Sequence, residues 1–131
     1  MVDFELCPCS GATLDKLIRP AILSVLTAGS LHGYRLVEKL AELRIARGAR
    51  PDATGIYRAL HSMQEDGFVT ARWDTKTGGP ARRLYRLTSR GRQCLRRWVG
   101  TLAEYDAALR QLLATARRAT RPARPGGKAR A

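Results

Sequence analysis

The feature that most constrains the fold is a change in the spacing of apolar residues at Phe68. Before this point, apolar residues recur every three or four positions, which is typical of amphipathic helices. After it, they alternate with polar residues in two runs that flank Gly78-Gly79-Pro80. This pattern predicts a β-hairpin over residues 68–87. The side chains predicted to face inward are Val69, Ala71, Trp73, Tyr85 and Leu87, and those predicted to face outward are Thr70, Arg72, Asp74, Arg82, Leu84 and Arg86.

Three helical segments precede the hairpin, over residues 14–28, 30–43 and 55–66. Their apolar residues follow the spacing of one helix face, which predicts that each helix buries that face in a shared core. In the second and third segments, the residues predicted to be buried are Leu36, Val37, Leu40, Leu43, Ile56, Leu60 and Met63.

Polar and special residues mark the helix ends. Ser30 is the predicted cap of the second helix, and Asp52 or Thr54 that of the third. Gly67 is suited to end the third helix because glycine readily adopts positive φ. Pro20 either kinks the first helix or opens a new segment as its first residue.

A final helix follows the hairpin and is predicted to be a dimerisation helix over residues 88–116, with Thr88 as its cap. Apolar residues recur along it at alternating threes and fours, a near-heptad stripe that is long for a helix packing only on a small domain. The stripe consists of Leu95, Trp98, Leu102, Tyr105, Leu109 and Leu112. Residues 117–131 are rich in Arg, Pro and Gly, which predicts a basic disordered tail.

The charge of the chain indicates a polyanionic partner. Its 24 Lys and Arg residues against 11 Asp and Glu residues give a net charge of +13, and subtracting the six cations of residues 117–131 still leaves +7. No apolar run is long enough to span a membrane, and the acidic start of the chain does not resemble a secretory signal. We therefore expect a cytoplasmic protein that is associated with the nucleoid and has no membrane partner.

The order helix, helix, helix, hairpin, helix is that of a winged helix-turn-helix with a dimerising helix added. The predicted fold class is therefore mainly α with a small β-hairpin wing. Residues 1–12 would form an irregular arm, residues 13–87 the DNA-binding domain, residues 88–116 the dimerisation helix and residues 117–131 the tail.

In this fold the third helix would enter the major groove of double-stranded DNA, while the hairpin contacts the neighbouring backbone. The exposed residues of the helix start and its outer side can reach bases and phosphates, and cations near the hairpin tip can hold phosphates. The predicted DNA-binding residues are Thr54, Gly55, Tyr57, Arg58, His61, Lys76, Arg82 and Arg83.

Three motifs strengthen this interpretation: "LHGYRLVEKL", "TGIYRALHSMQEDGFV" and "GGPARRLYRLTSRGRQCL". Their order and spacing, over about residues 20–113, resemble the PadR family of bacterial transcriptional regulators. The resemblance implies a homodimer, held by its terminal helices, that represses transcription at a dyad-symmetric operator. Some relatives bind flat aromatic molecules near the dimer interface, which makes a small aromatic effector a candidate ligand.

The sequence departs from the family pattern at positions that bear on DNA reading. Many relatives have Ser at position 55 and Pro at position 58, where this chain has Gly55 and Arg58. A phosphate contact made by the serine would pass to Thr54, and Arg58 would add a new contact. Leu84 replaces a frequent aromatic residue. The operator sequence of relatives therefore does not transfer to this chain.

Several residues have a structural interpretation beside the functional one. Tyr57 either contacts DNA or packs behind the recognition helix, and His61 either contacts DNA or is a half-exposed spacer. His32 and Tyr34 are expected to cap and pack the second helix. Along the final helix, Trp98 belongs to a dimer interface or to a stacking platform for a planar effector. The residues predicted to form this interface or effector pocket are Trp98, Leu102, Tyr105 and Leu109.

Cys7 and Cys9 form a Cys-Pro-Cys motif in the arm and are candidate redox residues. With partners from elsewhere they could also hold a metal. A thiol- or metal-responsive regulator, or a non-specific architectural DNA-binding protein, is therefore the alternative function. The chain has few acids and two histidines, and it lacks a phosphate-cradling glycine loop or a nucleophile with a visible base. We accordingly predict no catalytic residues, no cofactor and no dedicated metal site.

Overall fold

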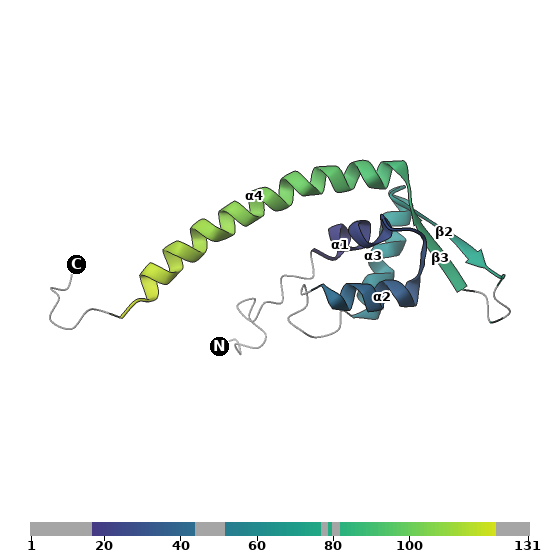
Figure 1. Ribbon diagram of the computed structural model, residues 1–131, viewed down its shortest axis with the longest axis horizontal. Coiled ribbons are helices and arrows are strands. Elements are labelled where there is room, and N and C mark those ends of the chain that lie inside the picture. Colours follow the sequence, from purple (N-terminus) through teal and green to yellow (C-terminus); the bar gives the residue numbers. More distant parts are fainter. Residues whose placement is uncertain (1–16, 44–51, 77–78, 80–81, 123–131) are drawn as a thin grey trace. The chain divides into compact units, whose positions relative to one another are not determined.

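The computed structural model describes residues 17–43, 52–76, 79 and 82–122 of the chain. The elements, in order, are α1 (Ile18–Leu26), β1 (Leu31–His32), α2 (Gly33–Glu42), α3 (Ala53–Glu65), β2 (Val69–Asp74), β3 (Arg82–Leu87) and α4 (Ser89–Thr120) (Figure 1). Helices predominate, and the strands form one small antiparallel sheet. The predicted fold class, mainly α with a β-hairpin wing and a long C-terminal helix, is confirmed. Two compact units divide within α4, between Arg96 and Arg97.

The predicted hairpin is confirmed, and a third strand adds to it. Strands β2 and β3 pair from Val69 opposite Leu87 to Asp74 opposite Arg82. Strand β1 pairs with the other edge of β3, with Leu31 opposite Tyr85, so the order in the sheet is β1-β3-β2. Leu31 was predicted to lie in a helix. Strand β1 was not predicted, because nothing local to this residue indicates its partner in β3.

The start of the second helix was therefore predicted wrongly. Helix α2 begins at Gly33, and the residue before it, His32, has an extended backbone with ψ of 153°. Ser30 is not the cap, because the strand pairing of the next two residues keeps the chain out of the helix. His32 occupies the N-cap position, but its side chain forms no capping hydrogen bond, so its predicted capping role is only partly confirmed.

The helical core forms largely as predicted. Leu36, Leu40, Ile56, Leu60 and Met63 are all buried. Two predicted core positions differ. Val37 is only half-buried, and Leu43 is 40% exposed because its extended backbone, with ψ of 128°, carries it away from the helix. Helix α1 completes the core with Ile22, Leu23 and Leu26, and the sheet contributes Val69, Tyr85 and Leu87.

Helix ends show the expected local chemistry. Pro20 is the third residue of α1, inside the first turn, where its missing N–H removes no intrahelical bond. Asp52 caps α3 by accepting a hydrogen bond from the backbone N–H of Thr54. Gly67 follows α3 with φ of +82°, which allows the chain to turn into β2.

The start of α4 is tied to the sheet. The hydroxyl of Thr88 accepts a hydrogen bond from the N–H of Gly91 at 3.0 Å and donates one to the carbonyl of Gly67 at 2.7 Å. The predicted cap is thus confirmed. Gly91 is buried, and a Cβ there would lie 2.2 Å from the carbonyl oxygen of Phe68. Only glycine lets the first turn of α4 approach the sheet this closely.

Helix α4 continues to Thr120, so residues 117–120 are helical and not part of a disordered tail as predicted. Trp98 and Leu102 are half-buried, whereas Tyr105, Leu109 and Leu112 are 49–64% exposed. The arm with Cys7 and Cys9 and the end of the predicted tail lie outside the described residues.

Candidate nucleic-acid interface

The N-terminus of α3 was expected to offer backbone N–H groups to a phosphate. Asp52 already uses one of these donors, since its Oδ1 lies 3.2 Å from the N–H of Thr54. Thr54 itself is exposed, with its hydroxyl available. Gly55 is half-buried, and a Cβ there would meet only Asp52 at 3.8 Å, so space does not require glycine at this position. A phosphate at this helix end would lie beside a carboxylate.

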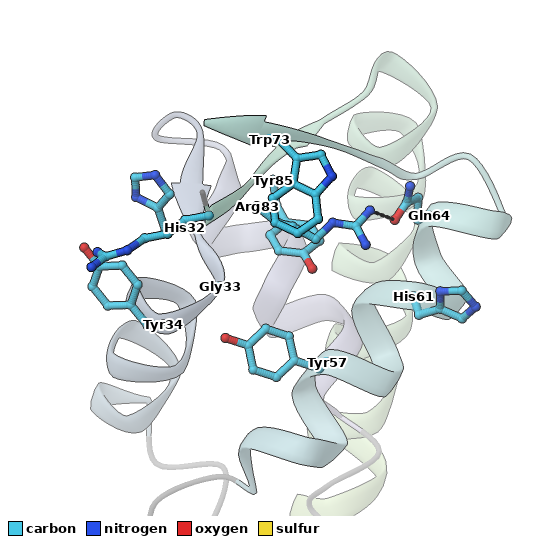
Figure 2. A pocket seen from close by; sticks show the side chains of 10 residues that line it. His32, Gly33, Tyr34, Tyr57, His61, Gln64, Trp73, Arg83 and Tyr85 are labelled. Carbon is cyan, nitrogen blue, oxygen red and sulfur yellow. Dashed lines mark hydrogen bonds between the residues drawn. The ribbon is translucent and has the colours of Figure 1, made fainter. Parts of the chain in front are cut away.

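The outer side of α3 presents Tyr57, Arg58 and His61, all exposed. The ring of Tyr57 lies against Gly33, where a Cβ would fall 2.5 Å from Tyr57 Cε1, yet 43% of Tyr57 remains exposed (Figure 2). Tyr57 therefore packs on the start of α2, as one of its two interpretations stated, and contact of its exposed part with DNA stays a prediction. His61 Nε2 lies 3.0 Å from Glu65 Oε1, one turn along the same helix.

On the wing, Arg83 lies over two aromatic rings. Its guanidinium carbon is 5.6 Å from the centre of the Trp73 ring and 5.9 Å from that of Tyr85. Arg83 also donates a hydrogen bond of 3.3 Å to Gln64 on α3, as Figure 2 shows. The two cation–π contacts and the hydrogen bond together hold the guanidinium beside α3. Burial raises the pKa of Tyr85, so this ring stays neutral under the arginine at physiological pH.

Trp73 differs from its prediction as an inward residue. It lies on the face that includes Val69, but it is 63% exposed. The reason is its position near the end of β2, where it pairs with Arg83 and lies beyond the buried residues of that strand. Its ring contacts the arginine and not the core.

Arg82 lies over a separate aromatic pair. Its guanidinium carbon is 5.0 Å from the centre of the Tyr34 ring, which stacks on His32 at 5.7 Å with an interplanar angle of 9°. His32 Nε2 lies 2.9 Å from Asp74 Oδ2, and because a carboxylate only accepts, the histidine donates. The predicted packing role of His32 and Tyr34 thus takes the form of a link from the start of α2 to the wing.

Asp74 fixes the exit of β2 into the hairpin turn. Its Oδ1 accepts a hydrogen bond of 3.1 Å from the backbone N–H of Lys76, and its Oδ2 accepts the bond from His32. These two hydrogen bonds hold the pKa of Asp74 below its ordinary value of 3.8, and the bond from the N–H of Lys76 has the larger effect. The side chain of Lys76 is exposed at the turn.

These elements enclose an open cleft of about 500 Å³ between α3 and the wing. It is lined by His32, Gly33, Tyr34, Tyr57, His61, Gln64, Trp73, Arg82, Arg83 and Tyr85 (Figure 2). Four predicted DNA-binding residues line this cleft, namely Tyr57, His61, Arg82 and Arg83. The other four, Thr54, Gly55, Arg58 and Lys76, are not part of its lining.

Sequence reasoning missed Gln64 and Trp73 as residues of this site. Gln64 could have been found from spacing, because positions 57, 61 and 64 lie on one face of a helix. Trp73 could not, because alternation along the strand predicts only which face the ring is on, not that the core ends before it.

The remaining predictions concern metal or redox residues, membrane spans and the last helix. Among those residues, no cluster of His, Cys, Asp or Glu is arranged to hold a metal ion, and Cys94 is half-buried. None of the described helices combines the length and apolar character needed to cross a bilayer. The predicted dimer or effector residues Trp98, Leu102, Tyr105 and Leu109 all lie on the second unit's part of α4.

The chain was compared with known families and proteins. The model of the transcriptional regulator PadR-like family matches residues 22–97. No curated protein sequence matches. A putative transcriptional regulator from Thermoplasma acidophilum is similar in structure, with 27% identity and a TM-score of 0.68, covering 79% of this chain and 96% of that one.

Two further structures are similar. A PadR family transcription regulator from Clostridium difficile has 22% identity and a TM-score of 0.63, covering 74% of this chain and 98% of that one, which shows a shared fold. Bacillus subtilis PadR in complex with operator DNA has 26% identity and a TM-score of 0.55, covering 63% of this chain and 46% of that one.

Proposed function

Because the chain belongs to the PadR-like family of transcriptional regulators, we propose that it is a homodimeric repressor that binds a dyad-symmetric DNA operator. The family is one of regulators and not of enzymes. The observation that carries the proposal is the cleft between α3 and the wing, where two arginines are held on aromatic rings beside the exposed side of the helix. The protein would act on the nucleoid, in the cytoplasm.

In this proposal α3 lies in the major groove and the wing follows the adjacent backbone. Tyr57, Arg58 and His61 face the bases, and Thr54 with Gly55 approaches a phosphate. Lys76, Arg82 and Arg83 hold phosphates from the wing. The guanidinium carbons of the two arginines lie 5.0–5.9 Å from aromatic ring centres. The N–H groups of Arg82, and those of Arg83 that do not bond to Gln64, would donate to phosphate oxygens. The related Bacillus subtilis protein, bound to operator DNA, supports the same use of the fold.

The exposed stripe of α4 supports a dimer. Tyr105, Leu109 and Leu112 are 49–64% exposed, and a helix of 32 residues with such a stripe gains stability from a partner. We place a second copy of the chain on this stripe. A planar aromatic effector would bind where the interface residues Trp98, Leu102, Tyr105 and Leu109 leave a gap. By changing the distance between the two recognition helices, it would lower operator affinity.

Selection of preferred sites from random duplex DNA tests this function. Wild type should recover a palindrome whose half-sites lie about one helical turn apart. The variant Arg82→Ala/Arg83→Ala should bind that palindrome far more weakly. The matched control, Arg117→Ala/Arg118→Ala, loses the same charge at the end of α4 and should keep the site preference. Sedimentation should give a dimer at micromolar concentration.

Two results would refute parts of the proposal, and a third would favour a sensing role for the N-terminal arm. Recovery of no consensus would favour the alternative of an architectural protein, whose binding falls steeply with salt and shows no preferred site. A consensus that is bound by a monomer would be consistent with the proposed DNA-binding role of the cleft but would contradict the proposed dimer. If conversion of Cys7 and Cys9 to serine abolished a response to oxidant or metal, the arm would be the sensor.

A further inference from the structure

A second hollow, of about 300 Å³, lies on the outward face of the sheet. Its lining includes Thr70, Arg72, Leu84 and Arg86, which alternate along β2 and β3 with residues that face the core. Ser30, just before β1, completes the hollow from the other edge of the sheet. None of the residues of α3 or of the cleft described above lines it, so it is a separate feature of the wing.

The strand register brings the donors of the hollow together. Thr70 is opposite Arg86, and Arg72 is opposite Leu84, so the two arginines are diagonal neighbours on one face. Diagonal positions in an antiparallel pair are about 7–8 Å apart, within reach of two long side chains that converge on one group. The lining residues therefore include two arginines and the hydroxyl-bearing Ser30 and Thr70, and none of them carries a carboxylate.

Both guanidinium groups are uncommitted within the described part of the chain. Neither Arg72 nor Arg86 forms a hydrogen bond or an ion pair with another described side chain, whereas Arg82 and Arg83 lie on aromatic rings. Asp74 is the carboxylate nearest in sequence on the same face. Its two oxygens accept hydrogen bonds from His32 and from the N–H of Lys76 instead. The charge of Arg72 contributes to the lowered pKa of Asp74, but neither oxygen of Asp74 bonds to Arg72, and Asp74 does not line the hollow.

We propose that this hollow binds a phosphate group. A phosphate has at least three oxygens that can accept hydrogen bonds, whereas a carboxylate has two. A phosphate can therefore use the donors of two guanidinium groups and two hydroxyls more fully. The hollow is at the small end of the range for ligand sites, which suits a phosphate or a diphosphate and not a large organic molecule. The group can come from a small phosphorylated molecule or from a DNA backbone that passes this face.

Titration with pyrophosphate in the absence of DNA tests the first source. Wild type should bind it and unfold at a higher temperature in its presence, because a ligand that binds only the native state raises the midpoint. Arg72→Gln/Arg86→Gln should bind it at least about tenfold more weakly, since this variant lacks two charge-assisted hydrogen-bond donors. Arg92→Gln/Arg96→Gln, which removes the same charge from exposed positions of α4, should bind as wild type does. Acetate at equal ionic strength should have no effect on any variant.

The salt dependence of DNA binding tests the second source. If the hollow holds a backbone phosphate, Arg72→Gln/Arg86→Gln should lower the slope of log K against log salt by about 0.9 for each phosphate that the variant no longer neutralises, relative to the Arg92→Gln/Arg96→Gln control. Unfolding midpoints without ligand show whether the variants fold. If the Arg72→Gln/Arg86→Gln variant folds and matches the control both in pyrophosphate affinity and in salt slope, the proposal is wrong.

Discussion

Replacement of Gly91 by alanine should destabilise the protein, although alanine is the better helix former. A Cβ at this position would lie 2.2 Å from the carbonyl oxygen of Phe68 and 2.6 Å from Leu87 Cδ1. The first contact is with backbone, so the helix start and the sheet have to separate. The carbonyl of Phe68 also accepts a hydrogen bond from the N–H of Thr88 at 3.1 Å, and the movement strains this bond.

The net effect follows from three contributions. Overpacking of this kind costs about 1–3 kcal/mol, and the weakened hydrogen bond adds about 0.5–1.5 kcal/mol. The helix propensity of alanine returns about 1 kcal/mol. We therefore expect Gly91→Ala to lower the free energy of unfolding by about 0.5–3.5 kcal/mol. The midpoint of thermal unfolding should fall by roughly 2–20 °C for a domain of this size.

Gly100 provides the matched control, since it lies in the same helix with no atom within 4 Å of a Cβ. Gly100→Ala should raise the free energy of unfolding by up to about 1 kcal/mol. Denaturant unfolding followed by circular dichroism measures both variants. If Gly91→Ala were as stable as Gly100→Ala, the close approach of α4 to the carbonyl of Phe68 would be wrong.

Three further predictions concern the wing and the last helix. Trp73→Ala removes a ring under Arg83, so operator affinity measured by fluorescence anisotropy should fall about tenfold, whereas Trp73→Phe should retain most of it. The lowered pKa of Asp74 means that its contribution to stability is present above about pH 4 and is lost as the pH falls through the lowered pKa. Unfolding free energies measured from about pH 6 to 2 should therefore decline less for Asp74→Asn than for wild type. Leu109→Glu/Leu112→Glu places two charges in the exposed stripe of α4 and should yield a monomer in sedimentation, and a dimer of unchanged stability would contradict the proposed interface.

Local signals allowed much of this fold to be predicted from the sequence. Thr88 was predicted as the cap of α4, and Asp52 as one of two candidate caps of α3, because a cap and its helix are adjacent in sequence. The hairpin was recognised because alternation and a glycine-proline turn occur together. Strand β1 was missed because its pairing of Leu31 with Tyr85 joins residues far apart in the chain.

The candidate site could be predicted only in part, for the same reason. Side-chain type and helix spacing indicate that Tyr57 and His61 face outward. They do not indicate that Arg83 stacks on Trp73 and bonds to Gln64, because those contacts depend on how the wing packs beside α3. The sequence therefore predicted which cations lie on the wing. It did not predict the aromatic rings that these cations contact.

The hydrogen bond from Arg83 to Gln64 has a consequence for attempts to redirect the protein to new DNA sites. A recognition helix transplanted from a relative would replace Gln64, and with it the anchor of an arginine that belongs to the wing. Engineered chimaeras should therefore exchange the helix and the hairpin as one cassette. Under the proposed function, a swap of α3 alone would alter backbone contacts together with base preference, and a selection for altered specificity could not separate the two effects.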